Sequence, residues 1–133
     1  MFKIFAALLI SVSFNSFAQE SDLCISLYNS GTKLINDANA NMKKANQLAV
    51  EANEQTQHSK ECEKLGEANT SRHYAIQWMD KGHRALEEAS NSCRYSDTIN
   101  SINSYMKFVE NNIMIQVRAN EELIEVMKSR GCI

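Results

Sequence analysis

Four cysteines constrain the fold of this chain most strongly, because they are regularly spaced in a sequence whose apolar pattern is otherwise that of helices. Cys24 and Cys62 are 38 residues apart, and Cys93 and Cys132 are 39 residues apart. At ~1.5 Å per residue, each interval corresponds to about 57 Å of α-helix. The two intervals therefore predict two helical segments of matched length with a cysteine near each end.

Apolar and small residues recur at steps of three and four, which is the periodicity of one helix face. A first helix is expected to begin at Ser21 as N-cap and to carry a narrow, alanine-rich stripe over residues 27–52. A second stripe covers residues 65–89, and the joint between the two helices is predicted between about residues 59 and 71.

The third helix has the strongest apolar stripe, over residues 99–127, and Val117 belongs to it. Ser96 or Asp97 is expected to cap its N-terminus. The chain contains no proline and only four glycines, a composition that favours helices over a sheet. The predicted fold class is all-α.

In an up-down-up three-helix bundle the first and third helices run parallel, which predicts the disulfides Cys24–Cys93 and Cys62–Cys132. The alternative pairing, Cys24 with Cys132 and Cys62 with Cys93, requires a turn near Asp80–Gly82 and a four-helix bundle. The apolar stripe passes through that point without a change of phase, which favours the three-helix bundle.

The N-terminus has the pattern of a signal peptide. One positive charge at Lys3 precedes an apolar segment over residues 4–14, and small residues at 16 and 18 predict cleavage after Ala18. The expected product is a single domain of residues 19–133 in the periplasm of a bacterium, with secretion as the alternative. The apolar segment is too short to span a bilayer, which takes roughly 20 residues, so no membrane insertion is expected after cleavage.

Charge and motifs exclude several classes of partner. Loss of Lys3 reduces the 14 basic residues to 13 against 16 acidic ones, a net charge of −3 that does not favour nucleic acid. Asp22 and Leu23 occupy the positions before Cys24 where a lipobox would require small residues, so no lipid anchor is expected.

No catalytic, cofactor or metal motif is recognisable in the sequence. Asp80 and Glu87 share a helix face with His83, but one helical turn of this kind supplies at most two ligands, which is too few for a metal site. We therefore expect no catalytic residue, no cofactor and no metal. A small-ligand or metal carrier with a cavity between helices, and a hydrolase built from helix-borne acids, are the alternatives.

Surplus apolar surface is the main functional indication. Phe108, Ile115 and Val126 form a second stripe on the third helix, and Tyr74 and Trp78 lie at the edge of the stripe on the second. These side chains either complete the core or form an interface with a protein partner or a second copy, since Trp and Tyr typically anchor interfaces. The sequence thus predicts an exported, non-catalytic interaction protein, of the inhibitor, immunity or adaptor type.

Overall fold

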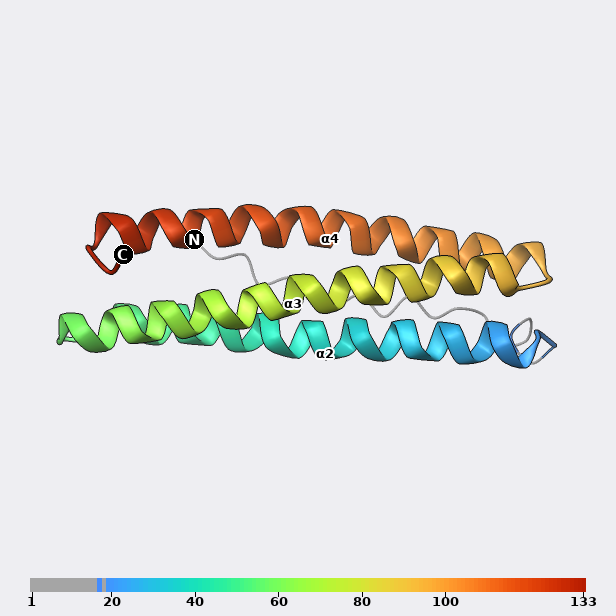
Figure 1. The fold of residues 1–133 in the computed structure, drawn as a ribbon, viewed down its shortest axis with the longest axis horizontal. Coiled ribbons are helices and arrows are strands. Elements are labelled where there is room, and N and C mark those ends of the chain that lie inside the picture. Colours follow the sequence, from blue (N-terminus) through green and yellow to red (C-terminus); the bar gives the residue numbers. More distant parts are fainter. Residues whose placement is uncertain (1–16, 18) are drawn as a thin grey trace.

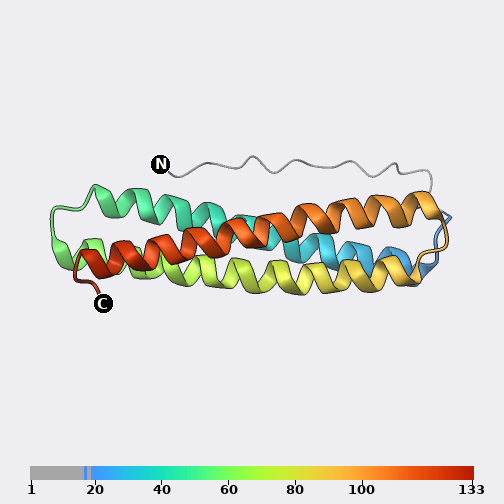
Figure 2. The same cartoon turned by 90° about the horizontal axis from the view of Figure 1, so that it is seen from above.

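The computed structural model describes residues 17 and 19–133, and within them the chain forms three long antiparallel helices (Figure 1). They are α2 (Asp22–Asn53), α3 (His58–Ser92) and α4 (Ser96–Ser129), and no strand is present in this part of the chain. α2 and α4 run in the same direction and α3 runs against them, as the colours of Figures 1 and 2 show. The predicted up-down-up three-helix bundle is confirmed.

The signal-peptide prediction falls on residues outside the described part of the chain, apart from Phe17. The Phe17 ring lies 4.6 Å, centroid to centroid, from the ring of Tyr28. None of the helices in the described residues combines the length and the hydropathy that crossing a bilayer requires.

Both predicted disulfides are present. Cys24–Cys93 joins the start of α2 to the end of α3, with Cα atoms 5.0 Å apart. Cys62–Cys132 joins the first turns of α3 to the segment after α4, with Cα atoms 5.2 Å apart. The bundle is thus fastened at both ends, because matched helix lengths bring the cysteines level. Bonds of this kind persist in oxidising compartments and indicate an extracytoplasmic chain.

The alternative turn near Asp80–Gly82 is excluded, since α3 is continuous through these residues. Gly82 is buried there against Gly31 of α2, and the carbonyl oxygen of each glycine lies 3.0 Å from where a Cβ of the other would stand. The absence of side chains at both positions therefore allows the closest approach of α2 and α3. Overall, these two helices pack more closely with each other than either packs with α4.

The predicted joint between the first two helices is wrong. α2 ends at Asn53 and α3 already begins at His58, so the connection is Glu54–Gln57 rather than residues 59–71. Gly66 lies inside α3, where nothing surrounds the position of a Cβ within 4 Å. The helix tolerates it because tertiary contacts on the opposite face outweigh the weak helix propensity of glycine.

The predicted N-terminal cap is present at α2, whereas the caps predicted for α4 are not. Ser21 caps α2 as expected, with its hydroxyl accepting a hydrogen bond from the backbone N–H of Cys24 at 3.2 Å. Ser96 and Asp97 do not cap α4. α4 has no side-chain cap. The carboxylate of Glu20, from a distant part of the chain, instead accepts hydrogen bonds from the N–H groups of Arg94 and Tyr95, which precede the helix, at 2.7 and 2.9 Å.

The apolar core is divided into two clusters along the bundle. The first, towards the Cys24–Cys93 end, contains Ile35, Ala38, Ala75, Met79, Leu86, Ala89, Ile102 and Val109. The second, towards the other end, contains Leu48, Ala49, Ala52, Leu65, Ala68, Leu123 and Met127. Val117, which was expected in the stripe of the third helix, is 38% exposed, and Gln116 and Leu123 are buried in that stretch of α4 instead.

Candidate functional site

The five residues predicted as an interaction surface differ in their burial. On α3, Tyr74 is 50% exposed, whereas Trp78 is half-buried and packs against the first core cluster. On α4, Ile115 is 37% exposed. Phe108 is half-buried with its ring stacked against Tyr105, and Val126 is half-buried against the second core cluster.

Tyr74 and the α4 residues belong to different faces of the bundle. The imidazole of His83 contacts the Glu110 carboxylate of α4 at 2.8 Å, so His83 marks the side of α3 that faces α4. Tyr74 precedes His83 by nine residues, which is half a turn at 100° per residue. Its side chain therefore projects away from α4, and the five residues do not form a single patch.

Two exposed residues that the sequence analysis did not select lie beside Ile115. Met114 is 56% exposed and Val117 is 38% exposed. Together the three side chains define the α4 outer surface, Met114, Ile115 and Val117, in the middle of the helix. A signal for it existed in the sequence, because an apolar run that covers more than one face of a helix must leave some of its members outside the core.

A polar layer separates the two core clusters, and it centres on Arg72 of α3, which is only 2% exposed. Its guanidinium donates hydrogen bonds to Gln116 Oε1 of α4 at 2.7 Å and to Asn46 Oδ1 of α2 at 2.8 Å. We define the polar layer as Asn46, Arg72 and Gln116. One residue from each helix contributes to it, so it links all three helices near the middle of the bundle.

The charge of Arg72 is not neutralised by a direct ion pair in the described residues. Burial lowers the pKa of Arg72, and the field of the Glu122 carboxylate partly opposes this change. Its Nε has no hydrogen-bond partner among the described atoms. Such a layer contributes little net stability, since the cost of desolvating a charge is similar to what its hydrogen bonds return.

Tyr105 is a half-buried acid-base group of α4. Burial, together with the neighbouring Tyr28, raises the pKa of Tyr105 to about 12, so its hydroxyl stays protonated at neutral pH. The acids on the last turns of α4 are exposed, and Glu125 there pairs with Lys128 at 2.9 Å. Arrangements of this kind are typical of a solvated helix surface.

Two groups of side chains have the spacing of metal ligands, and both include a disulfide. His58 lies with Cys62 and Cys132, and a second such group is Glu20 with Cys24 and Cys93. The sulfur atoms of each group are bonded to one another, so neither pair provides thiolates for a metal. Each group therefore offers a single strong ligand.

The chain matches no protein-family model, and neither a characterised protein nor a solved structure shows significant similarity to it.

Proposed function

We propose that this chain is an exported, non-catalytic interaction protein, located in the periplasm of a bacterium after removal of its signal peptide. It presents one side of α4 to a protein partner or to a second copy of itself. The disulfides support the exported location, since such bonds rarely persist in the cytoplasm.

The observation that carries this proposal is the α4 outer surface. Met114, Ile115 and Val117 lie within four residues of one another in the middle of a helix, and all are at least 37% exposed. At about 100° per residue, Ile115 and Val117 flank Met114 on its two sides, so the three side chains cover the outward half of the helix. Exposed apolar side chains that lie together often mark interaction sites in soluble proteins. The polar layer and the two disulfides hold the helix in place, so a partner would bind a preorganised surface and little ordering entropy would be lost.

Site-specific photocrosslinking in cells tests the proposal. A photoreactive amino acid replaces Met114 in one variant of the full chain and Tyr74 in a second, which is the matched control because it is as exposed but faces away from α4. We expect adducts of defined mass from position 114 and none from position 74. Adducts from position 74 alone would move the interface to α3, and no adduct from either position would refute the proposed function.

A disruption experiment separates binding from folding. Ile115→Asp places a charge on the α4 outer surface, where water can still solvate it, so the thermal stability should change little. The adduct from position 114 should disappear in this variant. Persistence of the adduct would contradict a role for this surface.

A further inference from the structure

The two disulfides differ in the burial of their cysteines and in the ionisable side chain that lies beside each bond. Cys24 is fully buried, with an exposed fraction of 0%, and its partner Cys93 is half-buried, whereas Cys62 and Cys132 are both half-buried at the other end of the bundle. The described residues contain no free cysteine, so any thiol that reacts with either bond must come from another molecule. Access and local charge then decide which bond reacts.

A buried carboxylate protects Cys24–Cys93. Glu20 is 7% exposed, and one of its oxygens lies within 4.8 Å of both sulfur atoms. The negative charge of Glu20 repels an incoming thiolate and also disfavours the thiolate that would leave. Its bonds to the backbone N–H groups of Arg94 and Tyr95 keep it in place.

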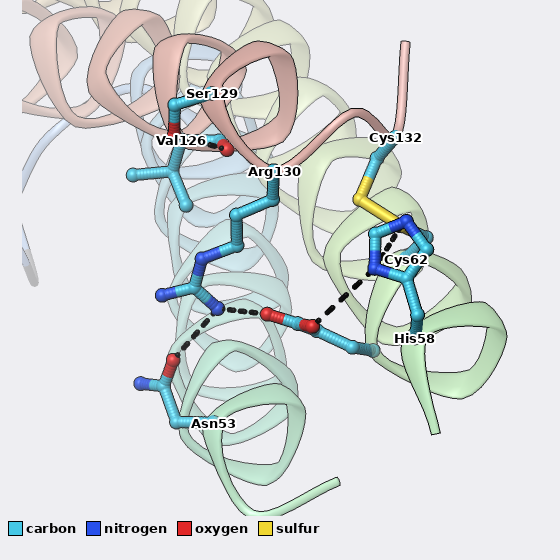
Figure 3. Close-up of a disulfide and its surroundings, with 8 residues drawn as sticks. Asn53, His58, Cys62, Val126, Ser129, Arg130 and Cys132 are labelled. Carbon is cyan, nitrogen blue, oxygen red and sulfur yellow. Dashed lines mark hydrogen bonds and ion pairs between the residues drawn. A yellow bond between two sulfur atoms is a disulfide. The ribbon is translucent and has the colours of Figure 1, made fainter. Parts of the chain in front are cut away.

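An imidazole lies beside Cys62–Cys132 instead (Figure 3). His58 Nε2 and Nδ1 are 3.6 and 3.9 Å from Cys62 Sγ, one turn away on the same helix. The remaining charges nearby are Glu61 of α3, 3.7 Å from the imidazole, and Arg130 of α4, which pairs with Glu61 and also donates to Asn53 of α2 at 3.1 Å. The imidazole can therefore stabilise a thiolate on Cys62, as a neighbouring His does for reactive cysteines in general.

We propose that Cys62–Cys132 is a thiol-exchange site whose substrate is the thiolate of an exported dithiol. The incoming thiolate attacks Cys132 Sγ, a new S–S bond forms to Cys132, and the bond between Cys132 and Cys62 breaks. The bonding electron pair leaves on Cys62 Sγ, beside His58. The second thiolate of the dithiol then attacks the first sulfur of the same dithiol, which is bonded to Cys132, and Cys132 leaves as a thiolate. The dithiol is thereby oxidised by two electrons to a disulfide, and the protein disulfide is reduced.

The structure favours this direction of attack. Cys132 lies after the end of α4 at Ser129 and outside any helix, so it can carry the mixed disulfide away from the bundle. Cys62 lies within α3 and stays beside His58 when the bond opens. Reduction would free the segment after α4 while Cys24–Cys93 and the first core cluster stay in place.

Differential alkylation tests the proposal. The folded full-length protein is incubated under native conditions with dithiothreitol as a dithiol and, separately, with glutathione as a monothiol. Free thiols are alkylated at intervals, and each cysteine is quantified by mass spectrometry. We expect Cys62 and Cys132 to open on the order of tenfold faster than Cys24 and Cys93. With glutathione we expect the mixed disulfide on Cys132.

Two variants test the role of His58 as a positioning residue. His58→Gln should slow the opening of Cys62–Cys132 several-fold and leave both the opening of Cys24–Cys93 and the thermal stability of the oxidised protein unchanged. His58→Lys, which places a cation at this position, should restore the rate. Opening of both disulfides in one phase, a glutathione adduct on Cys62, or equal rates for wild type and His58→Gln would each overturn the proposal.

Discussion

A single methyl group added at Gly82 tests how closely α2 and α3 pack. The Cβ of an alanine there would lie 2.7 Å from Ile35 Cγ1 and 3.0 Å from the carbonyl oxygen of Gly31. The Ile35 side chain can adjust, but a backbone oxygen moves only if the two helices separate. Gly82→Ala should therefore widen the bundle at this point.

Two opposing effects determine how much Gly82→Ala changes the free energy of unfolding. Alanine is favoured over glycine within a helix by about 1 kcal/mol. Overpacking a close-packed contact costs about 1–3 kcal/mol. Because the contact at Gly82 includes backbone, we expect the cost to prevail, with a net loss of roughly 1–2 kcal/mol in the free energy of unfolding.

Gly66→Ala is the matched control, because it is the same substitution in the same helix at a position with nothing within 4 Å. It should gain the helix propensity without the clash and stabilise the protein by ~0.5–1 kcal/mol. The difference between the two variants then isolates the packing cost.

Urea unfolding of the oxidised protein, followed by circular dichroism, measures both variants. The midpoints should move in opposite directions with unchanged slopes, since neither substitution alters the surface exposed on unfolding appreciably. Equal stabilisation by Gly82→Ala and Gly66→Ala would show that the helices are not in contact at Gly31 and Gly82, and would refute the reasoning.

Three further predictions concern the polar layer, the carboxylate of Glu20 and the aromatic residues of α3. Gln116→Leu should cost about 1.5–3 kcal/mol in urea unfolding, because it removes a hydrogen bond to a buried charge, and adding Arg72→Met should recover most of the loss. Burial alone would raise the pKa of Glu20, but hydrogen bonds from the backbone N–H groups of Arg94 and Tyr95 lower it below the ordinary value of a glutamate. Its contribution to stability is therefore complete above the pKa of the unfolded state and is lost as the pH falls through the lower pKa of the folded state, so Glu20→Gln should show a shallower loss of melting temperature in acid. Trp78→Ala should lower the free energy of unfolding by roughly 2 kcal/mol, whereas Tyr74→Ala should change it by less than about 1 kcal/mol, as measured by thermal denaturation.

The disulfide pairs and the helix count could be predicted because both depend on a constant of helix geometry. A fixed rise per residue converts the intervals Cys24–Cys62 and Cys93–Cys132 into lengths, and equal lengths bring the cysteines to the same ends. The alanine stripe of α2 was equally informative, since periodicity alone identifies a face that packs against another helix.

Features that depend on distant parts of the chain were missed. Glu20 holds the connection before α4 by hydrogen bonds to residues 74 and 75 positions away, which local capping rules that favour Ser96 or Asp97 do not predict. Arg72 lies four residues after Ala68 and three before Ala75, on the core face of α3, yet its acceptors are on other helices. The start of α3 was misplaced because its first turns are polar, and the apolar pattern begins only at Leu65.

The polar layer and the disulfides are related through the register of α4. Gln116 follows Val109 by seven residues and precedes Leu123 by seven, so a slip of two helical turns would place an apolar side chain opposite Arg72. The guanidinium would then be buried without its acceptor on α4, at the same cost of about 1.5–3 kcal/mol as Gln116→Leu. The observed register avoids this cost, and in it Cys62 meets Cys132. The buried arginine adds little net stability, but it disfavours a shifted register of α4. It therefore favours the correct pairing of the cysteines before either bond has formed.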